Sequence, residues 1–186
     1  MTSPDTDLPN PIRTRRLGFV VAALVFALDQ IVKWVIIHPL ALPRVLQITV
    51  LPIFNLTWAE NYGISLGLFP AGSDIQRWIL VAVTVILSIG IVLWMRRERY
   101  RVEILSLGMV LGGAIGNIVD RSLRGYVVDY ADLHVGVFRP FLIFNLADVA
   151  ITFGVLIVLA RSLLSRDKRD EPQKDADLTN PAAPET

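Results

Sequence analysis

The chain has 186 residues, enough for one ordinary domain. It is 53% hydrophobic and 19% charged, whereas soluble proteins are about 45–50% apolar and about 25% charged, so a soluble globule is disfavoured. The 18 basic and 17 acidic residues nearly cancel, which leaves no whole-chain basic footprint for nucleic acid. The absence of cysteine excludes thiol nucleophiles, disulfides, iron–sulfur clusters and zinc sites built on cysteine.

Four apolar stretches are long enough, or nearly so, to cross a bilayer, which takes about 20 residues. They cover residues 17–37, 78–95, 102–119 and 141–160. The third carries glycines at a spacing of four, Gly108, Gly112 and Gly116, which is typical of closely packed membrane helices. We predict an all-α polytopic membrane protein with four transmembrane helices, surrounded by membrane lipids.

Basic residues gather on one side of these spans. Three precede the first span, four join the second to the third, and four follow the fourth: Arg13, Arg15, Arg16, Arg96, Arg97, Arg99, Arg101, Arg161, Arg166, Lys168 and Arg169. The opposite connections hold fewer: Arg44, Arg77, Arg121, Arg124 and Arg139. The positive-inside rule therefore predicts that both termini are cytoplasmic and that segments 38–77 and 120–140 face outward.

The chain divides into a membrane domain and two polar ends. We expect residues 12–165 to form the membrane domain and residues 1–11 and 166–186 to be disordered in the cytoplasm. Segment 44–69 is rich in β-forming residues, so we predict a small extracytoplasmic β-sheet on the outer membrane surface. The first span has a long apolar core and no small-x-small cleavage site, so we interpret it as a retained anchor rather than a signal peptide.

Ionisable residues inside a bilayer cost about 2.5–3.5 kcal/mol each on insertion scales, so each suggests a function. Asp29 and Lys33 lie one helical turn apart and are interpreted as a structural ion pair. Asp148 is expected roughly 10 Å below the start of its span and has no basic residue at helical spacing. Such a carboxyl can share a proton with a second one, as in aspartic proteases; the candidates on that side are Asp120, Asp129 and Asp132.

Two other functions are weighed against this one. The same carboxylates could line a proton pathway, but the inner halves of the spans offer few polar groups for a relay. Gly63-Ile64-Ser65-Leu66-Gly67 matches a serine nucleophile elbow, but no alternating βαβ pattern supplies the strand-to-helix turn that an elbow needs. Ser65 could also pair with Lys33, but Lys33 already has Asp29 as its partner. His38 and His134 are isolated, so no metal site is predicted.

Five motifs occur along residues 29–151 in a recognisable order. They are Asp29-Gln30-x-x-Lys33, Glu60-Asn61-x-Gly63, Gly112-Gly113-Ala114-x-Gly116-Asn117-x-x-Asp120-Arg121, Gly125-x-Val127-Val128-Asp129-Tyr130 and Phe144-Asn145-x-Ala147-Asp148-x-x-Ile151. With these motifs the sequence resembles the bacterial lipoprotein signal peptidase family, also called signal peptidase II. It departs from that pattern at Leu66, where many members have an aromatic residue, and in segment 131–138.

The resemblance implies a four-span aspartic peptidase of the bacterial inner membrane. Its catalytic dyad would be Asp129 and Asp148, which activate water near the outer leaflet; which of the two starts with the proton is left open. The residues that it implies bind substrate or support the site are Asp29, Lys33, Asn61, Gly63, Gly116, Asn117, Asp120, Arg121, Asn145 and Ala147. The implied substrate is a diacylglyceryl-modified prolipoprotein, cut on the N-terminal side of its lipidated cysteine. No cofactor, metal, nucleic acid or oligomer is implied.

Overall fold

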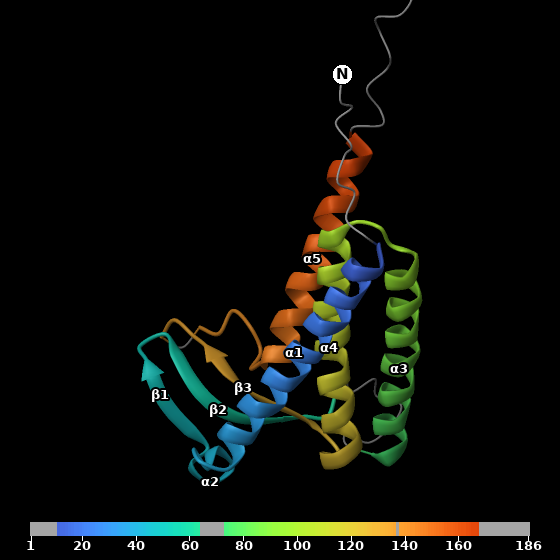
Figure 1. Cartoon of the computed structure of the whole chain (residues 1–186). Coiled ribbons are helices and arrows are strands. Elements are labelled where there is room, and N and C mark those ends of the chain that lie inside the picture. The colour runs from blue at the N-terminus through green and yellow to red at the C-terminus, as the bar shows by residue number, and fades with distance from the viewer. Residues whose placement is uncertain (1–10, 64–72, 137, 168–186) are drawn as a thin grey trace, which may run out of the picture.

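The computed structural model describes residues 11–63, 73–136 and 138–167. Its elements in chain order are α1 (Pro11–Ile37), α2 (Leu42–Val45), β1 (Gln47–Leu51), β2 (Phe54–Asn61), α3 (Asp74–Arg97), α4 (Arg101–Arg124), β3 (Val127–Leu133) and α5 (Leu146–Asp167). The four long helices form a bundle with the sheet at one end (Figure 1). The start of α1 and the end of α5 both lie at the end away from the sheet (Figure 1).

All four long helices are long and apolar enough to cross a membrane. The qualifying segments are Thr14–Ile37, Asp74–Arg97, Arg101–Arg124 and Leu146–Leu164. Together with the small sheet, they confirm the predicted fold class.

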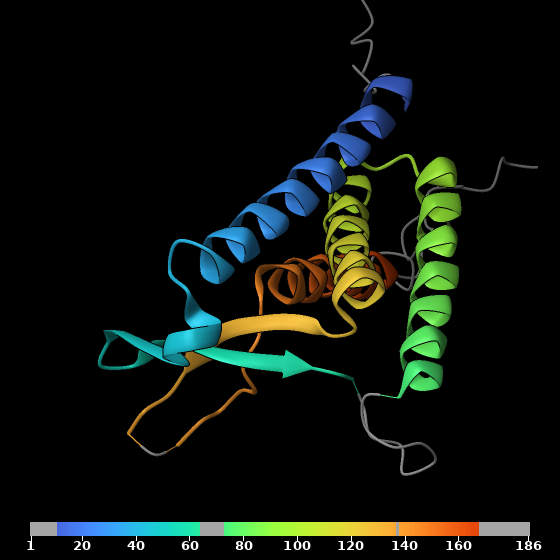
Figure 2. The ribbon, with the colours of Figure 1, turned by 90° about the horizontal axis from the view of Figure 1, so that it is seen from below.

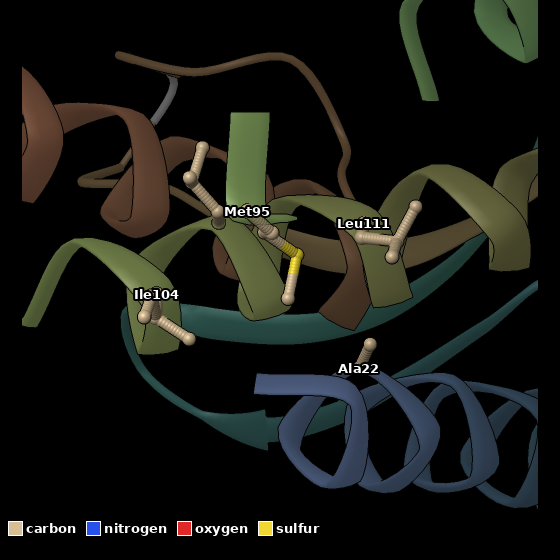
Figure 3. Close-up of a cluster of buried hydrophobic side chains, with 5 residues drawn as sticks. Ala22, Met95, Ile104 and Leu111 are labelled. Carbon is tan, nitrogen blue, oxygen red and sulfur yellow. The ribbon is translucent and has the colours of Figure 1, made fainter. Parts of the chain in front are cut away.

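Helix α4 is the centre of the bundle, since it packs against α1, α3 and α5. Gly108 and Gly112 lie so close to the backbone of α1 that a Cβ atom at either position would overlap a carbonyl oxygen, that of Gly18 or that of Ala22. The predicted close packing along the glycine stripe is therefore confirmed. Farther from the sheet, Met95 of α3 packs with Ala22 and three side chains of α4 in an apolar core cluster (Figure 3).

The first three spans extend beyond their expected limits of 17–37, 78–95 and 102–119, because hydropathy marks only the apolar part of a helix. The first polar turn of α3 illustrates this. Ser73 caps it by accepting a hydrogen bond from the Gln76 N–H, and Asp74 pairs with Arg77 at 3.0 Å. Helix α4 continues past residue 119 and ends at Arg124. The next residue, Gly125, caps it in a left-handed conformation with a φ of 91°.

The fourth span was predicted to begin at residue 141, but α5 begins at Leu146. The preceding residues are extended, because Phe144 pairs with the free edge of β3. Its N–H donates to the Ala131 carbonyl at 3.1 Å, and its carbonyl accepts from the Ala131 N–H at 2.8 Å. Asp148 therefore lies in the first turn of α5 rather than roughly 10 Å below the start of a helix.

The sheet is antiparallel, with strand order β1-β2-β3. Figure 2, seen from the sheet end, shows β3 nearer to α5 than β2 is. The predicted β segment 44–69 contains β1 and β2, while its residues 64–69 lie outside the described part of the chain. Strand β3, which contains Asp129, was not predicted, since segment 120–140 was assigned only as an outward-facing connection.

The two ends that were predicted to be disordered lie almost wholly outside the described residues. The exceptions are Pro11 at the start of α1 and residues 166–167 at the end of α5. These residues continue the helices by a turn or less, so the expected boundaries at 12 and 165 are slightly too narrow.

Candidate active site

One residue, Asn145, contacts both Asp129 and Asp148 at the place where the sheet joins α5. The Asn145 side-chain Nδ2 donates to Asp129 Oδ1 at 2.6 Å, and its backbone N–H donates to Asp148 Oδ2 at 3.1 Å. In return, Asn145 Oδ1 accepts from the Asp148 N–H at 3.0 Å. This reciprocal pattern is a capping box at the start of α5. The cap that begins the helix thus also holds the two carboxyl groups next to each other.

A second asparagine contacts Asp148 from α4. Asn117 Nδ2 donates to Asp148 Oδ1 at 3.0 Å, and Asn117 Oδ1 accepts from Lys33 Nζ at 3.4 Å. Since an ammonium group can only donate, the oxygen of this amide must face Lys33. The amide nitrogen is thereby directed at the carboxylate.

A third asparagine contacts Asp129 from the end of β2. Asn61 Nδ2 donates to Asp129 Oδ2 at 3.0 Å, while Asn61 Oδ1 accepts from the Gly63 N–H at 2.8 Å. Gly63 has a φ of 92°, a conformation that favours glycine. Gly63 therefore makes the turn that fixes which way the Asn61 amide points.

Asp129 lies in an environment that disfavours its charge. It is only 2% exposed, and burial, followed by repulsion from Asp148, raises its pKa to about 6. The hydrogen bonds from Asn145 and Asn61 and the charge of Lys33 act in the opposite direction. A carboxyl group that titrates near neutral pH beside a second one suits acid–base chemistry.

Asp148 has no basic residue at helical spacing on its own helix, but in the folded chain a cation from another helix lies near it. Arg121 of α4 interacts electrostatically with Asp148, Asp129 and Asp120. Helical spacing along α5 could not reveal this, because Arg121 lies on another helix and beyond the expected end of its span at residue 119. Its buried Nε has no hydrogen-bond partner among the described residues.

A buried ionic network lies directly behind these carboxyls. Lys33 Nζ is 2.9 Å from Asp29 Oδ2, as the predicted ion pair requires, and 2.7 Å from Asp120 Oδ2. All three side chains are fully buried. Asp120 also pairs with Arg124 at 2.6 Å. Sequence analysis missed Arg124 as part of this network, although its i,i+4 spacing from Asp120 signals such a pair.

The network holds the elements of the site together through backbone groups. Asp29 Oδ1 accepts from the Ala147 N–H at 3.1 Å, and Asp120 Oδ2 accepts from the Val128 N–H at 3.2 Å. Gly116 leaves room for the Asp29 carboxylate, since a Cβ there would lie 2.5 Å from Asp29 Oδ2. Helices α1 and α4 thereby position the start of α5 and the strand that carries Asp129.

The structure thus brings all the predicted site residues into one region at the sheet end. It adds Tyr130, whose hydroxyl accepts from the Leu146 N–H at 3.2 Å and so satisfies one of the free N–H groups at the start of α5. Ser65, the alternative nucleophile, lies outside the described residues. Among the residues that are described, no group of three or more histidine, aspartate or glutamate side chains could hold a metal ion.

An apolar cavity of about 290 Å³ opens beside Asp148. It lies between the start of α5 and the extended segment before it, and its lining residues are Leu133, Phe141, Leu142, Phe144, Asp148, Val149, Thr152 and Phe153. A hydrophobic group bound there would reach one of the two carboxyls without crossing polar surface.

Comparison with known proteins places this arrangement in a family. The sequence model of the family described as "Signal peptidase (SPase) II" matches residues 21–164. The chain belongs to the signal peptidase II family. As a member, it is an aspartic-type signal peptidase with four membrane helices.

Individual relatives agree with this membership. The chain is 53% identical over 153 residues to the lipoprotein signal peptidase of Sphingopyxis alaskensis, covering 82% of this chain and 88% of the relative. It is also 53% identical over 155 residues to that of Rhizorhabdus wittichii, covering 83% and 90%. A bacterial membrane enzyme solved at 2.3 Å resolution by the in meso method superimposes with a TM-score of 0.67 at 25% identity, covering 86% of this chain and 93% of that one.

Proposed function

We propose that this peptidase removes signal peptides from diacylglyceryl-modified prolipoproteins, cutting on the N-terminal side of the lipidated cysteine. Asp129 and Asp148 are the catalytic residues. The observation that carries the proposal is the single asparagine, Asn145, which contacts both carboxyls at the start of α5. The lipoprotein signal peptidases of two bacteria, each 53% identical to this chain, supply the substrate class.

In the proposed reaction, water attacks the scissile carbonyl without a covalent intermediate. One carboxyl of the dyad is ionised and removes a proton from the water, and the other is protonated and donates to the carbonyl oxygen. The resulting gem-diol collapses as the dyad returns a proton to the departing amine of the lipidated cysteine. The pKa of about 6 for Asp129 allows both protonation states near neutral pH.

Other site residues would assist by contact or by position. The Arg121 guanidinium faces the dyad and has a buried Nε without a partner among the described residues, so it would donate to a substrate carbonyl. The apolar cavity beside Asp148 would receive a hydrophobic part of the substrate next to the scissile bond. Asn61 and Asn117 orient the carboxyls, and Lys33, Asp29 and Asp120 hold the elements that carry them.

The decisive experiment is cleavage of a diacylglyceryl-modified precursor by the purified full chain. We expect Asp129→Asn and Asp148→Asn each to abolish cleavage while remaining folded, whereas Ser65→Ala retains substantial activity and a chelator does not inactivate the enzyme. Near-normal turnover by either asparagine variant would refute the dyad. Loss of activity in Ser65→Ala would favour a serine mechanism, and ion flux in liposomes that requires Asp148, without any cleavage, would favour transport.

We also infer that the chain lies in the bacterial inner membrane with both termini in the cytoplasm and the sheet end at the outer leaflet. The basic residues at the end of α3, in the connection and at the start of α4 support this orientation: Arg96, Arg97, Arg99 and Arg101. Because the chain contains no cysteine, the labelling of a single introduced cysteine shows on which side of the membrane that residue lies. A membrane-impermeant maleimide applied to intact spheroplasts should label Val135→Cys, which is 67% exposed at the sheet end, and not Arg99→Cys. The reverse labelling would invert the topology.

A further inference from the structure

Strand β2 ends in an aromatic cluster around one carboxylate that the proposed reaction does not use. Glu60 Oε2 accepts from the Tyr62 hydroxyl at 2.6 Å, and Glu60 Oε1 accepts from Trp58 Nε1 at 3.4 Å. Glu60 is exposed, and the Tyr62 side chain is 40% exposed. The cluster is therefore at the surface rather than in the core.

Tyr126 connects this cluster to the next strand. Its ring packs edge-on against Trp58, with centroids 6.3 Å apart, and tilted against Tyr62 at 5.5 Å. Its hydroxyl also interacts electrostatically with Glu60. Since Tyr126 immediately precedes β3, these four residues, here called the Glu60 clamp, join the end of β2 to the start of β3.

The clamp lies directly beside the contact between Asn61 and Asp129. Side chains alternate between the two faces of a strand, so Asn61 points away from the clamp and toward the dyad, where it donates to Asp129. The β2–β3 register is irregular between Leu56 and Ala59, and regular pairing resumes only for the last residues, with Asn61 opposite Val127. The regular ladder that holds the strand end carrying Asn61 therefore spans only three residue pairs, from Ala59–Asp129 to Asn61–Val127.

We propose that Glu60 is a positioning residue for the dyad: the Glu60 clamp holds the end of β2 against β3 so that Asn61 stays hydrogen-bonded to Asp129. This inference rests on the proposed function of Asp129. It assigns Glu60 no contact with substrate. Its positioning effect on the reaction passes through Asn61.

The clamp has a measurable consequence because Asn61 stabilises the charged form of Asp129. If the strand end loosens, that hydrogen bond weakens, and the pH profile of kcat/KM should move to higher pH. The charged groups that face Asp129 from other elements are Asp148 of α5, Arg121 of α4 and Lys33 of α1. None of them is changed in the variants that follow.

Two variants separate positioning from simple electrostatics. Tyr62→Phe removes one hydrogen bond of the clamp and leaves the Glu60 charge in place. Glu60→Gln removes the charge and turns one acceptor oxygen into a donor that faces the aromatic donors. Loss of a nearby negative charge alone would move the profile to lower pH, so the two effects of Glu60→Gln have opposite signs.

The matched control is Glu98→Gln in the connection that follows α3. Glu98 Oε2 accepts from Trp94 Nε1 at 3.3 Å, which reproduces the Trp58–Glu60 contact far from the dyad. This control tests whether disturbing a tryptophan–glutamate pair anywhere in the chain alters the profile. We expect it to behave as the wild type.

The experiment measures kcat and KM for the diacylglyceryl precursor from pH 5 to pH 9. We expect Tyr62→Phe and Glu60→Gln to move the profile upward by about half a pH unit, roughly a threefold loss of kcat/KM on its acidic side, with KM unchanged, and Asn61→Ala to move it at least as far. A wild-type profile in Tyr62→Phe, or a downward shift in Glu60→Gln, would overturn the positioning role. If Asp129→Asn still cleaved, the proposed function itself would fail, so the two failures are distinguishable.

Discussion

The unusual environment of Asp129 predicts that removal of its charge changes the pH dependence of stability. The pKa of this carboxyl is raised from 3.8 to about 6 in the folded chain. The folded state therefore binds the proton more tightly than the unfolded state does. The stabilisation that this gives is complete at low pH and is lost as the pH rises through about 6. Asp129→Asn has no such titration.

The size of the effect follows from the two pKa values. At about 1.36 kcal/mol for each pKa unit, the shift from 3.8 to about 6 corresponds to about 3 kcal/mol in total. About 2 kcal/mol of this falls between pH 4 and pH 8. For a chain of this size, about 2 kcal/mol changes the melting temperature by about 4–8 °C.

The assay is thermal unfolding of wild type and Asp129→Asn in the same detergent, from pH 4 to pH 8. Titrations common to both proteins cancel in the difference of their melting temperatures, so the wild type should lose about 4–8 °C relative to the variant over this range. The variant also has one acceptor oxygen for the two donors from Asn61 and Asn145. That mismatch costs about 1–3 kcal/mol at every pH and does not change the slope. Parallel melting curves, or a wild type that gains stability with pH, would refute this reasoning.

Two further substitutions test the packing behind the dyad. Gly116→Ala should lower stability by about 1–3 kcal/mol and impair cleavage, because its Cβ would overlap the Asp29 carboxylate. The control is Gly90→Ala, whose Cβ would have no atom within 4 Å, and it should melt as the wild type does. Equal melting temperatures for the two alanine variants would contradict the close approach. Lys33→Met should cost about 3–5 kcal/mol, since it leaves Asp29 and Asp120 without their shared cation. The double variant Lys33→Met/Asp120→Asn should recover part of that loss. If Lys33→Met alone were as stable as the wild type, Lys33 would not stabilise the two buried carboxylates.

The membrane-spanning part of the fold could be predicted from the sequence, because a bilayer restricts which secondary structures can cross it. A chain that crosses hydrocarbon must satisfy its backbone within each span, so four long apolar stretches allowed few alternatives to four helices. The start of α5 was misplaced because residues 141–144 are apolar and a short apolar run fits a helix or a strand equally well. Strand β3 was missed because aspartates, here Asp129 and Asp132, are depleted in strands.

The site could be predicted only in part, because spacing along one element does not show which side chains of other elements lie beside it. Family resemblance identified the residues, but spacing along one helix could not show that Arg121 faces Asp148. The sequence does contain one local signal for this contact: an asparagine three residues before an aspartate, Asn145 and Asp148, is a helix-capping pattern. It would have started α5 at the observed residue and brought the two side chains together.

The site has a common design in its three asparagines, each of which has its amide oxygen occupied by a donor. The donors are the Gly63 N–H for Asn61, the Lys33 ammonium for Asn117 and the Asp148 N–H for Asn145. Since an amide has one oxygen and one NH₂ group, occupying the oxygen decides where the nitrogen points. Each nitrogen then donates to a carboxyl of the dyad.

This design explains why amides rather than acids surround the dyad. An aspartate at any of the three positions would place a like charge against Asp129 or Asp148, whereas an asparagine adds a donor of the same shape without charge. The donors are fixed before substrate arrives, because the ionic network and the capping box hold them. Reorganisation during the proposed reaction is therefore small, which is the condition under which hydrogen bonds to the two proposed catalytic carboxyls contribute most. The same reasoning supports the proposed role of the Glu60 clamp. Of the three amides, Asn61 alone is the last residue of a strand, where the regular ladder spans only three residue pairs, so the clamp adds support there.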